Sequence, residues 1–206
     1  MDWPVGDFRD WAAWLGARLA NAPRVDSGDF PIEQESRPAA VLIAIVPRAA
    51  GVTILLTERA AHLPAHAGQI SFPGGGVDDG DADAAATALR ESVEEIGLES
   101  RFVHVVGRLG NYYTVSGYEV APVVGVLEPG FALTPCADEV ERVLELPLAQ
   151  LLDPSHYERR WVERRGLRGQ THFIEIDGDT VWGATANMLL MLAHALGADG
   201  APREVG

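Results

Sequence analysis

The chain has 206 residues, of which 47% are hydrophobic, and it carries a formal net charge of −14 and a single cysteine. This length and apolar content suffice for one domain with a substantial core. The negative charge argues against a nucleic-acid-binding surface, because contacts to phosphates need a positive face. A lone cysteine excludes an intrachain disulfide framework and fits a reducing cytosol, so we expect a cytoplasmic protein.

Residues 1–37 are predicted to form an amphipathic helix and a linker. Phe8, Trp11, Leu15 and Leu19 recur at helical spacing, which indicates an apolar face packed on the domain or on a partner subunit. The segment lacks the basic start and uninterrupted apolar run of a targeting peptide. No stretch reaches the roughly 20 apolar residues of a membrane span. The Trp-rich N-terminal segment also offers a surface for a homodimer, which the sequence does not decide.

Apolar runs beyond residue 38 predict a sheet. A hairpin is expected from the runs 40–46 and 52–59, with a turn at 47–51. Further strand segments are expected at 102–109, 113, 118–127, 139–146, 159–165 and 171–181, with turns at 116–117 and 166–170. A short helical stretch at 147–152, a helix at 184–196 and a flexible tail at 199–206 complete the chain.

The segment 74–98 is the most informative part of the sequence, because a run of glycines leads into a helix predicted over 82–96. Asp81 is expected to cap this helix and Gly97 to end it. At about 100° per residue, two opposite stripes result. The stripe expected to face a cleft contains Thr87, Glu91, Glu94 and Glu95, and the stripe expected to face the core contains Ala86, Leu89, Val93 and Ile96.

Three carboxylates on one stripe indicate a missing counter-ion. Like charges at i,i+3 and i,i+4 destabilise a helix by a few tenths of a kcal/mol per pair, and no basic residue lies among Glu91, Glu94 and Glu95. Hard oxygen ligands favour Mg²⁺ or Mn²⁺. The alternative is a solvated acidic helix face.

The same residues resemble the second half of the Nudix box, G-x5-E-x7-R-E-U-x-E-E-x-G-U, in which U is a bulky apolar residue. The matching positions are Arg90, Glu91, Glu94, Glu95, Gly97 and Leu98. In the first half, Gly76 falls on the glycine but Ala82 stands where a glutamate is expected, and Ser92 replaces an apolar residue. Gly75-x5-Asp81 restores the spacing if the loop is one residue longer.

The stretch before the box resembles the L-L-T-x-R…G-x-x-x-F-P-G-G element of coenzyme A pyrophosphatases. Leu55 to Arg59, Gly68 and Phe72 to Gly75 carry this resemblance, whereas Ala60 and Pro64 stand where that element usually has Ser and Arg. The segments 112–122 and 182–186 also look like this subfamily. The resemblance covers roughly residues 38–196 and implies a domain at 38–198. Its fold would be α/β, an α/β/α sandwich with a mixed sheet and the box helix over it.

The resemblance also implies roles for individual residues. The catalytic set would be Arg90, Glu91, Glu94 and Glu95, and metal would be held by Glu91, Glu94, Glu95 and the carbonyl of Gly75. Arg90 would reach Glu94 or Glu91 and hold a carboxylate in ligand geometry. For the general base, a metal-bound hydroxide aligned by Glu91 is preferred, and the side chain of Glu139 is the reserve candidate. The substrate-binding set would be Arg59, His66, Gly68, Phe72, Gly74 and Tyr113.

The implied function is the Mg²⁺- or Mn²⁺-dependent hydrolysis of coenzyme A or acyl-coenzyme A to 3′,5′-ADP and a 4′-phosphopantetheine fragment. The same chemistry on ADP-ribose, a dinucleotide or a nucleoside triphosphate is one alternative. A non-catalytic Nudix module that senses a nucleotide is another, and Ala82 and Ser92 keep it open.

Other chemistries fit the sequence less well. His62 and His66 have zinc-ligand spacing only if helical, and Pro64 opposes a helix, so a role in binding substrate phosphate or in structure is favoured. Tyr112 and Tyr113 could stack an adenine or pack in the core. The one basic cluster, formed by Arg159, Arg160, Arg164, Arg165 and Arg168, could meet a 3′-phosphate or form a solvated hairpin.

Overall fold

A computed structural model describes residues 2–29, 36–64, 66–164 and 167–205. Its central sheet follows the order β1-β7-β8-β2-β3-β4, with β5 on β2, β6 on β8 and β9 on β3. These strands are β1 (Ser27–Gly28), β2 (Arg37–Arg48), β3 (Gly51–Arg59), β4 (Ile70–Ser71), β5 (Gly74–Gly76), β6 (Val103–Arg108), β7 (Tyr112–Tyr113), β8 (Tyr118–Leu127) and β9 (Val140–Pro147). β2 pairs in parallel with β8 and antiparallel with β3, so the sheet is mixed, as expected.

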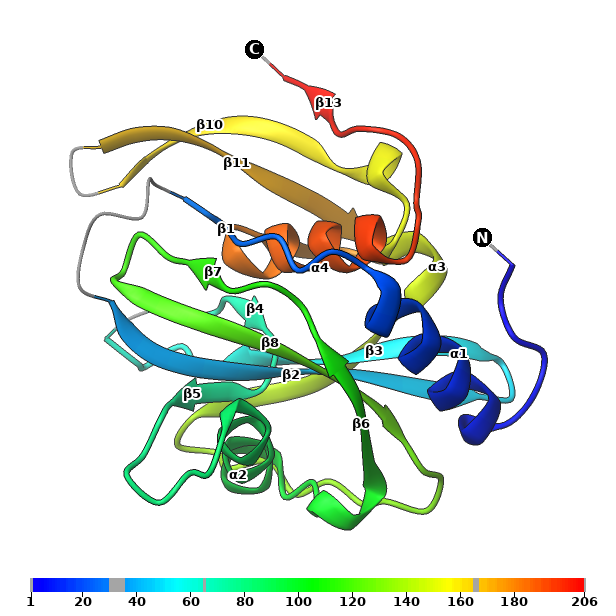
Figure 1. The fold of residues 1–206 in the computed structure, drawn as a ribbon. Helices are drawn as coiled ribbons and strands as arrows, with labels where there is room; N and C mark the ends of the chain where they lie inside the picture. The colour runs from blue at the N-terminus through cyan, green and yellow to red at the C-terminus, as the bar shows by residue number, and fades with distance from the viewer. Residues whose placement is uncertain (1, 30–35, 65, 165–166, 206) are drawn as a thin grey trace.

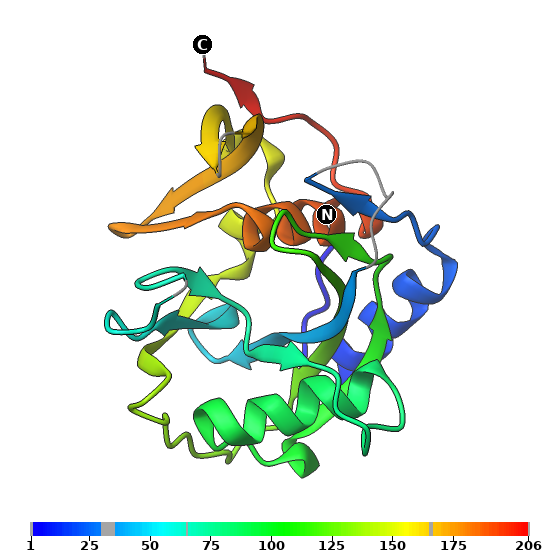
Figure 2. The ribbon, with the colours of Figure 1, turned by 90° about the vertical axis from the view of Figure 1, so that its left-hand side faces the viewer.

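Helices cover both faces of this sheet (Figure 1). They are α1 (Phe8–Asn21), α2 (Ala84–Ile96), α3 (Leu148–Leu151) and α4 (Ala184–Ala195), and short 3-10 turns occur at Ser100–Phe102 and Pro154–His156. Figure 2 shows α2 below the sheet and α4 above it. The expected α/β/α architecture with the box helix over a mixed sheet is confirmed.

A second sheet lies beyond α4, in the order β12-β11-β10-β13 (Figure 1). It contains β10 (Glu158–Arg164), β11 (Leu167–Ile176), β12 (Asp179–Trp182) and β13 (Arg203–Glu204). The single strand expected at 171–181 is wrong. Asp177 and Gly178 both have positive φ and make a two-residue hairpin turn between β11 and β12, the usual use of an Asp-Gly pair. The residues Leu167 to Gln170, expected as a link, already belong to β11.

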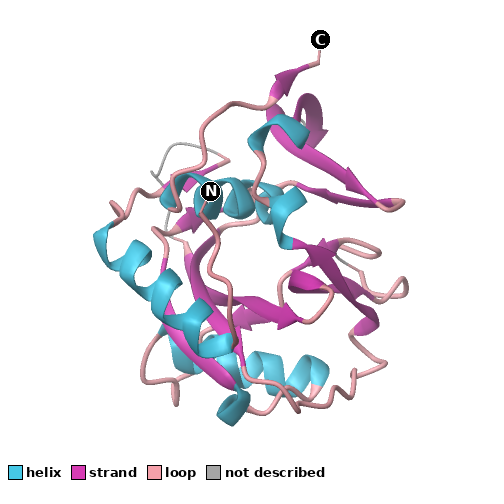
Figure 3. Cartoon of the chain, turned by 90° about the vertical axis from the view of Figure 1, so that its right-hand side faces the viewer, coloured by secondary structure: helices cyan, strands magenta, loops and turns pink. Residues whose placement is uncertain are grey.

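The terminal segments both contact the rest of the chain. α1 buries its expected face, Phe8, Trp11, Leu15 and Leu19, within the larger hydrophobic cluster, and Figure 3 shows it alongside the sheet. Within 199–206, where we expected a flexible tail, Arg203–Glu204 pair in parallel with Glu158 and Arg159 of β10. In the part of the chain that the structure describes, no helix is long and apolar enough to cross a membrane.

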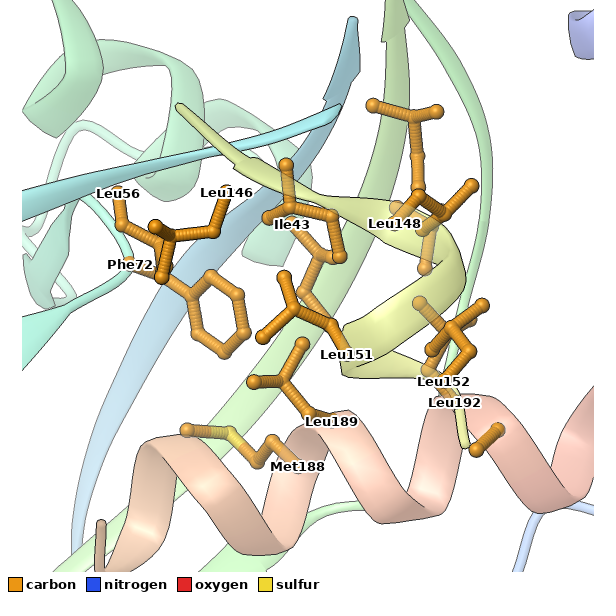
Figure 4. Close-up of a cluster of buried hydrophobic side chains, with 14 of the residues drawn as sticks. Ile43, Leu56, Phe72, Leu146, Leu148, Leu151, Leu152, Met188, Leu189 and Leu192 are labelled. Atoms are coloured by element: carbon orange, nitrogen blue, oxygen red, sulfur yellow. The ribbon is translucent and has the colours of Figure 1, made fainter. Parts of the chain in front are cut away.

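The larger core fills the space between the sheet and the helices α1, α3 and α4. In Figure 4, Leu189 of α4 points toward Leu151 of α3, and Leu192 of α4 lies beside Leu152. Leu189, Leu192, Leu151 and Ile43 are fully buried. A smaller cluster lies under α2 and includes Ala88 and Ile96.

The expected faces of the box helix are partly wrong. Val93, expected in the core, is 43% exposed, while Thr87, Ser92 and Glu95 are buried. The sheet covers a stripe rotated from the one that apolar residues define, so a hydroxyl at position 92 faces inward and donates to the carbonyl of Ala88. The N-terminal boundary also differs.

The helix begins at Ala84, and Asp83 rather than Asp81 caps it by accepting from the N–H of Ala86. Gly97 ends it, as expected, in the left-handed conformation, and its N–H donates to the carbonyls of Ser92 and Val93.

Candidate active site

The glycine turn before the box helix is held against the sheet. β5 pairs antiparallel with β2, with Val41 opposite Gly74 and Ala40 opposite Gly75. At Gly74 φ is +155°, and a Cβ there would collide with the carbonyl oxygen of Ala40. Because no other residue fits this approach, glycine lets the N–H of residue 74 donate to Glu95 Oε2, 3.2 Å away.

Gly75 forms a cradle for a carboxylate. A Cβ on this residue would lie 2.6 Å from Glu91 Cδ and Oε1, closer than real Cβ atoms approach. The carboxylate of Glu91 therefore occupies the space that a side chain at position 75 would fill. The turn and the helix are thus fitted to each other at an oxygen donor.

Arg90 organises the carboxylates of the helix. Its Nη1 donates to Glu91 Oε1 at 2.8 Å and to Glu94 Oε2 at 3.1 Å, so both contacts that the sequence suggested are present. Its Nη2 donates to the carbonyl of Gly76 at 2.8 Å and to Asp81. One guanidinium therefore ties the helix to both the glycine turn and the loop that follows it.

Asp81 supplies a carboxylate next to Ala82, which stands where the box motif has a glutamate. Its two oxygens accept from Arg90 Nε at 3.1 Å and Nη2 at 3.0 Å, and Oδ2 also accepts from Thr87 Oγ1 at 2.9 Å. The N–H of Asp78 completes the set. These donors hold the pKa of Asp81 well below its usual range. The residue expected as a helix cap is instead the main anchor of Arg90.

Glu95 is the most deeply buried carboxylate of the helix, with 5% of its surface exposed. Burial raises its pKa to about 7, while the Gly74 N–H and Arg59 oppose this shift and Glu91 and Glu139 add to it. Its nearest cation, Arg59 Nη1, lies 3.9 Å away. Burial also raises the pKa of Glu91. The helix thus carries negative charge that the neighbouring arginines only partly compensate.

The donor set fits a hard divalent cation. In the described ranges, no three acidic, histidine or cysteine side chains converge closely enough to hold an ion on their own, because Arg90 holds Glu91 and Glu94. The chemistry is nevertheless that of Mg²⁺ or Mn²⁺ ligation: buried carboxylate oxygens of like charge next to the backbone of Gly75. Glu91, Glu94 and Glu95 are the side chains that would hold the ion.

A cavity of about 230 Å³ opens beside this turn. Of the residues expected to bind substrate, Arg59, His66, Phe72 and Gly74 line it. Gly68 and Tyr113 do not line it. Gly68 lies two residues after His66 and has a φ of +67°. The hydroxyl of Tyr113 donates to Glu119.

Other parts of the cavity wall come from segments that are distant in sequence from Arg59. Val162 and Gln170 of the second sheet, Trp182 of β12 and Met188 of α4 line the cavity, with Asp29 from the linker. The segment 182–186, which the family resemblance pointed to, therefore does reach the site. Only folding brings Asp29 and Val162 there, and no sequence pattern identified them.

Asp29 is fixed by a partly buried polar network. It accepts from the hydroxyl of Tyr112 at 2.5 Å and from the N–H of Val115 at 3.0 Å. Asn187 of α4 donates to the same hydroxyl and contacts His172 Nδ1 at 2.6 Å. Tyr112 is fully buried, so it packs in the core and does not stack on a ligand.

Among the described residues, the remaining basic candidates and His62 do not line this cavity. In the second sheet, Arg159 pairs with Glu204, Arg160 pairs with Glu158 and Glu175, and Arg168 lies over the ring of Trp161. These contacts match a solvated hairpin. The side chain of Arg164 and the whole of Arg165 lie outside the described residues.

Comparisons with known proteins identify the family of the chain. Residues 36–171 match the family model of the NUDIX domain. Proteins named uncharacterized Nudix hydrolase NudL, from Salmonella paratyphi B and from Escherichia coli, are each 44% identical over 161 residues, covering 78% of this chain and 83% of the relative. A crystal structure of a Nudix hydrolase from Alicyclobacillus acidocaldarius is 20% identical, covers 59% of this chain and 83% of that one, and gives a TM-score of 0.47.

The chain therefore belongs to the Nudix family. It is a Nudix hydrolase, and enzymes of this family act on nucleoside diphosphate derivatives and generally use divalent cations such as Mg²⁺ or Mn²⁺. This assignment favours the hydrolase over the non-catalytic module.

Proposed function

We propose that this enzyme hydrolyses the diphosphate of coenzyme A or acyl-coenzyme A to 3′,5′-ADP and (acyl-)4′-phosphopantetheine. The observation that carries the proposal is the lining of the cavity. It includes Arg59 and Gly74, which both contact Glu95, together with the apolar side chains of Val162 and Met188. Such a chamber suits a diphosphate that bears a long, weakly polar arm.

The chain's own residues divide the work. Arg59 contacts a phosphate through guanidinium N–H donors, and the apolar wall keeps bulk water from the arm. Arg90 positions Glu91 and Glu94. Bound Mg²⁺ or Mn²⁺ would supply charge neutralisation at the phosphates and activation of water. In the reaction a water oxygen forms a bond to one phosphorus, the bridging P–O bond breaks, and the water gives up its proton.

The proton acceptor is part of the proposal. Glu139 is exposed and close enough to Glu91 and Glu95 to raise the pKa of both. It is therefore available as a base, alongside a water aligned by Glu91. The variant Glu139→Gln distinguishes these two bases. If Glu139 is the base, the variant loses kcat and regains it at higher pH, where hydroxide replaces the missing carboxylate.

Product identification tests the substrate. Incubation with coenzyme A and Mg²⁺ or Mn²⁺, followed by mass spectrometry, is expected to yield 3′,5′-ADP and 4′-phosphopantetheine. The variant Glu95→Gln is expected to lose turnover. Glu99→Gln, which alters an exposed acid just beyond the helix, is the matched control and is expected to keep it. Intact coenzyme A together with cleavage of another diphosphate would overturn the substrate, and full turnover by Glu95→Gln would overturn the centre.

Asp29 favours a second candidate, the same hydrolysis on a nucleoside diphosphate whose ribose hydroxyls are free. A carboxylate on the cavity wall accepts from a hydroxyl and repels a 3′-phosphate. Comparing kcat/KM for coenzyme A and dephospho-coenzyme A, in the wild type and in Asp29→Asn, decides between them. The second candidate requires a preference for dephospho-coenzyme A that Asp29→Asn reduces.

A further inference from the structure

A second cavity, of about 370 Å³, lies away from the catalytic turn. It is bounded by the end of α1, by the linker 22–27, by the turn after β6 and by the last turn of α4. Figure 1 shows the chain between α1 and β1 passing α4. Its volume is in the range of small-molecule sites, and its wall shares no residue with that of the first cavity.

Glycine and backbone contacts fix the shape of this second cavity. A Cβ on Gly110 would collide with the carbonyl of Val25, so the linker lies directly on the turn after β6. The N–H of Ser27 donates to the carbonyl of Asn111, and the N–H of Asn111 donates to Asp26 Oδ1 at 2.7 Å. The linker is thus tied down beside the opening.

The floor of the cavity is apolar and its rim is basic. Leu19 of α1, Leu109, and Met191 and Ala195 of α4 form the floor, and Arg24 and Arg108 stand at the rim. Arg108 uses one donor on Asn111 Oδ1, 3.0 Å away. Within the residues that the structure describes, Arg24 has no hydrogen-bond or ion-pair partner.

The wall of the cavity carries two guanidiniums with unused donors, although the chain as a whole has a net charge of −14. Each guanidinium carries five N–H donors in a fork that matches carboxylate and phosphate. Asp26, which accepts from the N–H of Asn111, is the one acidic side chain among the described residues of the wall, against the two arginines, so the wall keeps an excess of positive charge. An anionic head group would complete these donors, and an aliphatic body would cover Leu19, Leu109 and Met191.

We propose that the cavity between α1 and α4 binds a small amphipathic anion, with a carboxylate or phosphate head on Arg24 and Arg108 and an aliphatic chain against Leu19, Leu109 and Met191. The proposal is independent of the substrate of the catalytic site. Since α4 contributes Met188 to the first cavity and Met191 to the second, the two sites share one helix.

Methionine-methyl NMR can locate such a ligand. The chain has three methionines; Met188 reports on the catalytic cavity and Met191 on the second. Titration of protein labelled with ¹³C-methyl methionine with octanoate is expected to shift Met191 in a saturable way before Met188 moves. Affinity is expected to rise about fourfold per methylene from hexanoate to octanoate, because each buried methylene contributes about 0.8 kcal/mol.

Variants test each part of the site. Arg24→Gln combined with Arg108→Gln is expected to weaken octanoate binding at least tenfold, as loss of charged hydrogen bonds requires, and to leave 1-octanol unaffected. Ala195→Leu is expected to block both ligands by filling the floor. The control Arg101→Gln changes an exposed arginine outside the cavity and is expected to change nothing. An unmoved Met188 resonance shows that each variant is folded.

Octyl phosphate in a parallel titration distinguishes the two head groups. Tighter binding than octanoate assigns a phosphate head, and weaker binding assigns a carboxylate. The proposal is overturned if octanoate leaves Met191 unmoved or shifts Met188 alone. It is also overturned if octanol binds as tightly as octanoate, or if the double arginine variant binds like the wild type.

Discussion

The two faces of the central sheet are built differently. The face covered by α1, α3 and α4 is largely apolar, with Leu189 and Leu192 fully buried, and Tyr112 and Asn187 on this side are hydrogen-bonded to each other. The face covered by α2 buries Thr87, Ser92 and Glu95 next to a small apolar cluster. Apolar burial stabilises the fold, whereas a buried carboxylate of raised pKa costs stability and prepares a cation site. The comparison assigns the candidate metal ligands to the α2 face and most of the apolar stabilisation to the other face, where Met188 also lines the substrate cavity.

The largest effect is expected on the α2 face. Glu95→Gln removes a carboxylate that would hold the metal, so kcat/KM is expected to fall about 10³-fold, the equivalent of several kcal/mol of transition-state stabilisation. The same change removes a buried charge, so the metal-free variant is expected to be more stable than the wild type at pH 8. Steady-state kinetics and urea unfolding measure the two quantities. A variant that is both inactive and less stable would contradict the division between the faces.

The matching change on the other face is Leu189→Ala. The cavity it leaves among Leu151, Met188 and Leu192 is expected to lower the free energy of unfolding by about 3 kcal/mol. Metal affinity, measured by calorimetry on folded protein, is expected to stay within twofold of the wild type. Val93→Ala on the exposed side of α2 is the control and should alter stability by less than about 0.5 kcal/mol. A loss of metal affinity in Leu189→Ala that accompanies the loss of stability would contradict the separation of the two faces.

The pH dependence of stability sharpens the comparison. The carboxyl of Glu95 has a pKa of about 7 in the folded metal-free protein and 4.5 as its ordinary value. Between these values the folded state binds more protons than the unfolded state, so stability is full below pH 4.5 and falls as pH rises through 7. The loss is expected to reach roughly 3 kcal/mol. Urea unfolding in EDTA should show it in the wild type, and Glu95→Gln should lack this part of the slope. An identical slope in both proteins would contradict the assignment.

The smallest of these effects is expected at Asp81. Asp81→Asn keeps the size of the side chain but removes the charge that anchors Arg90, so Glu91 and Glu94 are held less firmly. A loss of about 10- to 100-fold in kcat/KM is expected, typical of residues that orient ligands. Addition of excess Mn²⁺ should recover part of it. Asp79→Asn is the exposed control two residues away. Wild-type kinetics in Asp81→Asn would show that Arg90 needs no anchor.

Local signals in the sequence were sufficient for several elements. The Ala-rich run and Gly97 predicted the box helix to within two residues, and the spacing of Phe8, Trp11, Leu15 and Leu19 predicted both α1 and its buried face. The contact of Arg90 with Glu94 is the i,i+4 pair that helical geometry predicts. These features depend on residues within a turn or two of each other.

Features that depend on distant segments were missed. Val93 is exposed and Glu95 is buried, the reverse of the expected faces. The position of the sheet, and not the sequence of the helix, decides which side chains are covered. Asp29 and Val162 reach the cavity from the linker and the second sheet, some 130 residues apart in sequence. Asp81 was noticed for its spacing, but its pairing with Arg90 requires the loop to fold back over the helix.

Tyr112 and Tyr157 give the molecule a built-in optical signal for alkaline solution. Both phenols are fully enclosed, one between Asp29 and Asn187 and the other donating to the carbonyl of Leu151, and burial raises the pKa of each. In an alkaline titration, the absorbance change of these two tyrosines therefore occurs at a higher pH than that of a free phenol. These two phenols can ionise only when the native packing around them opens. The absorbance rise of both tyrosines at high pH is therefore expected to coincide with unfolding.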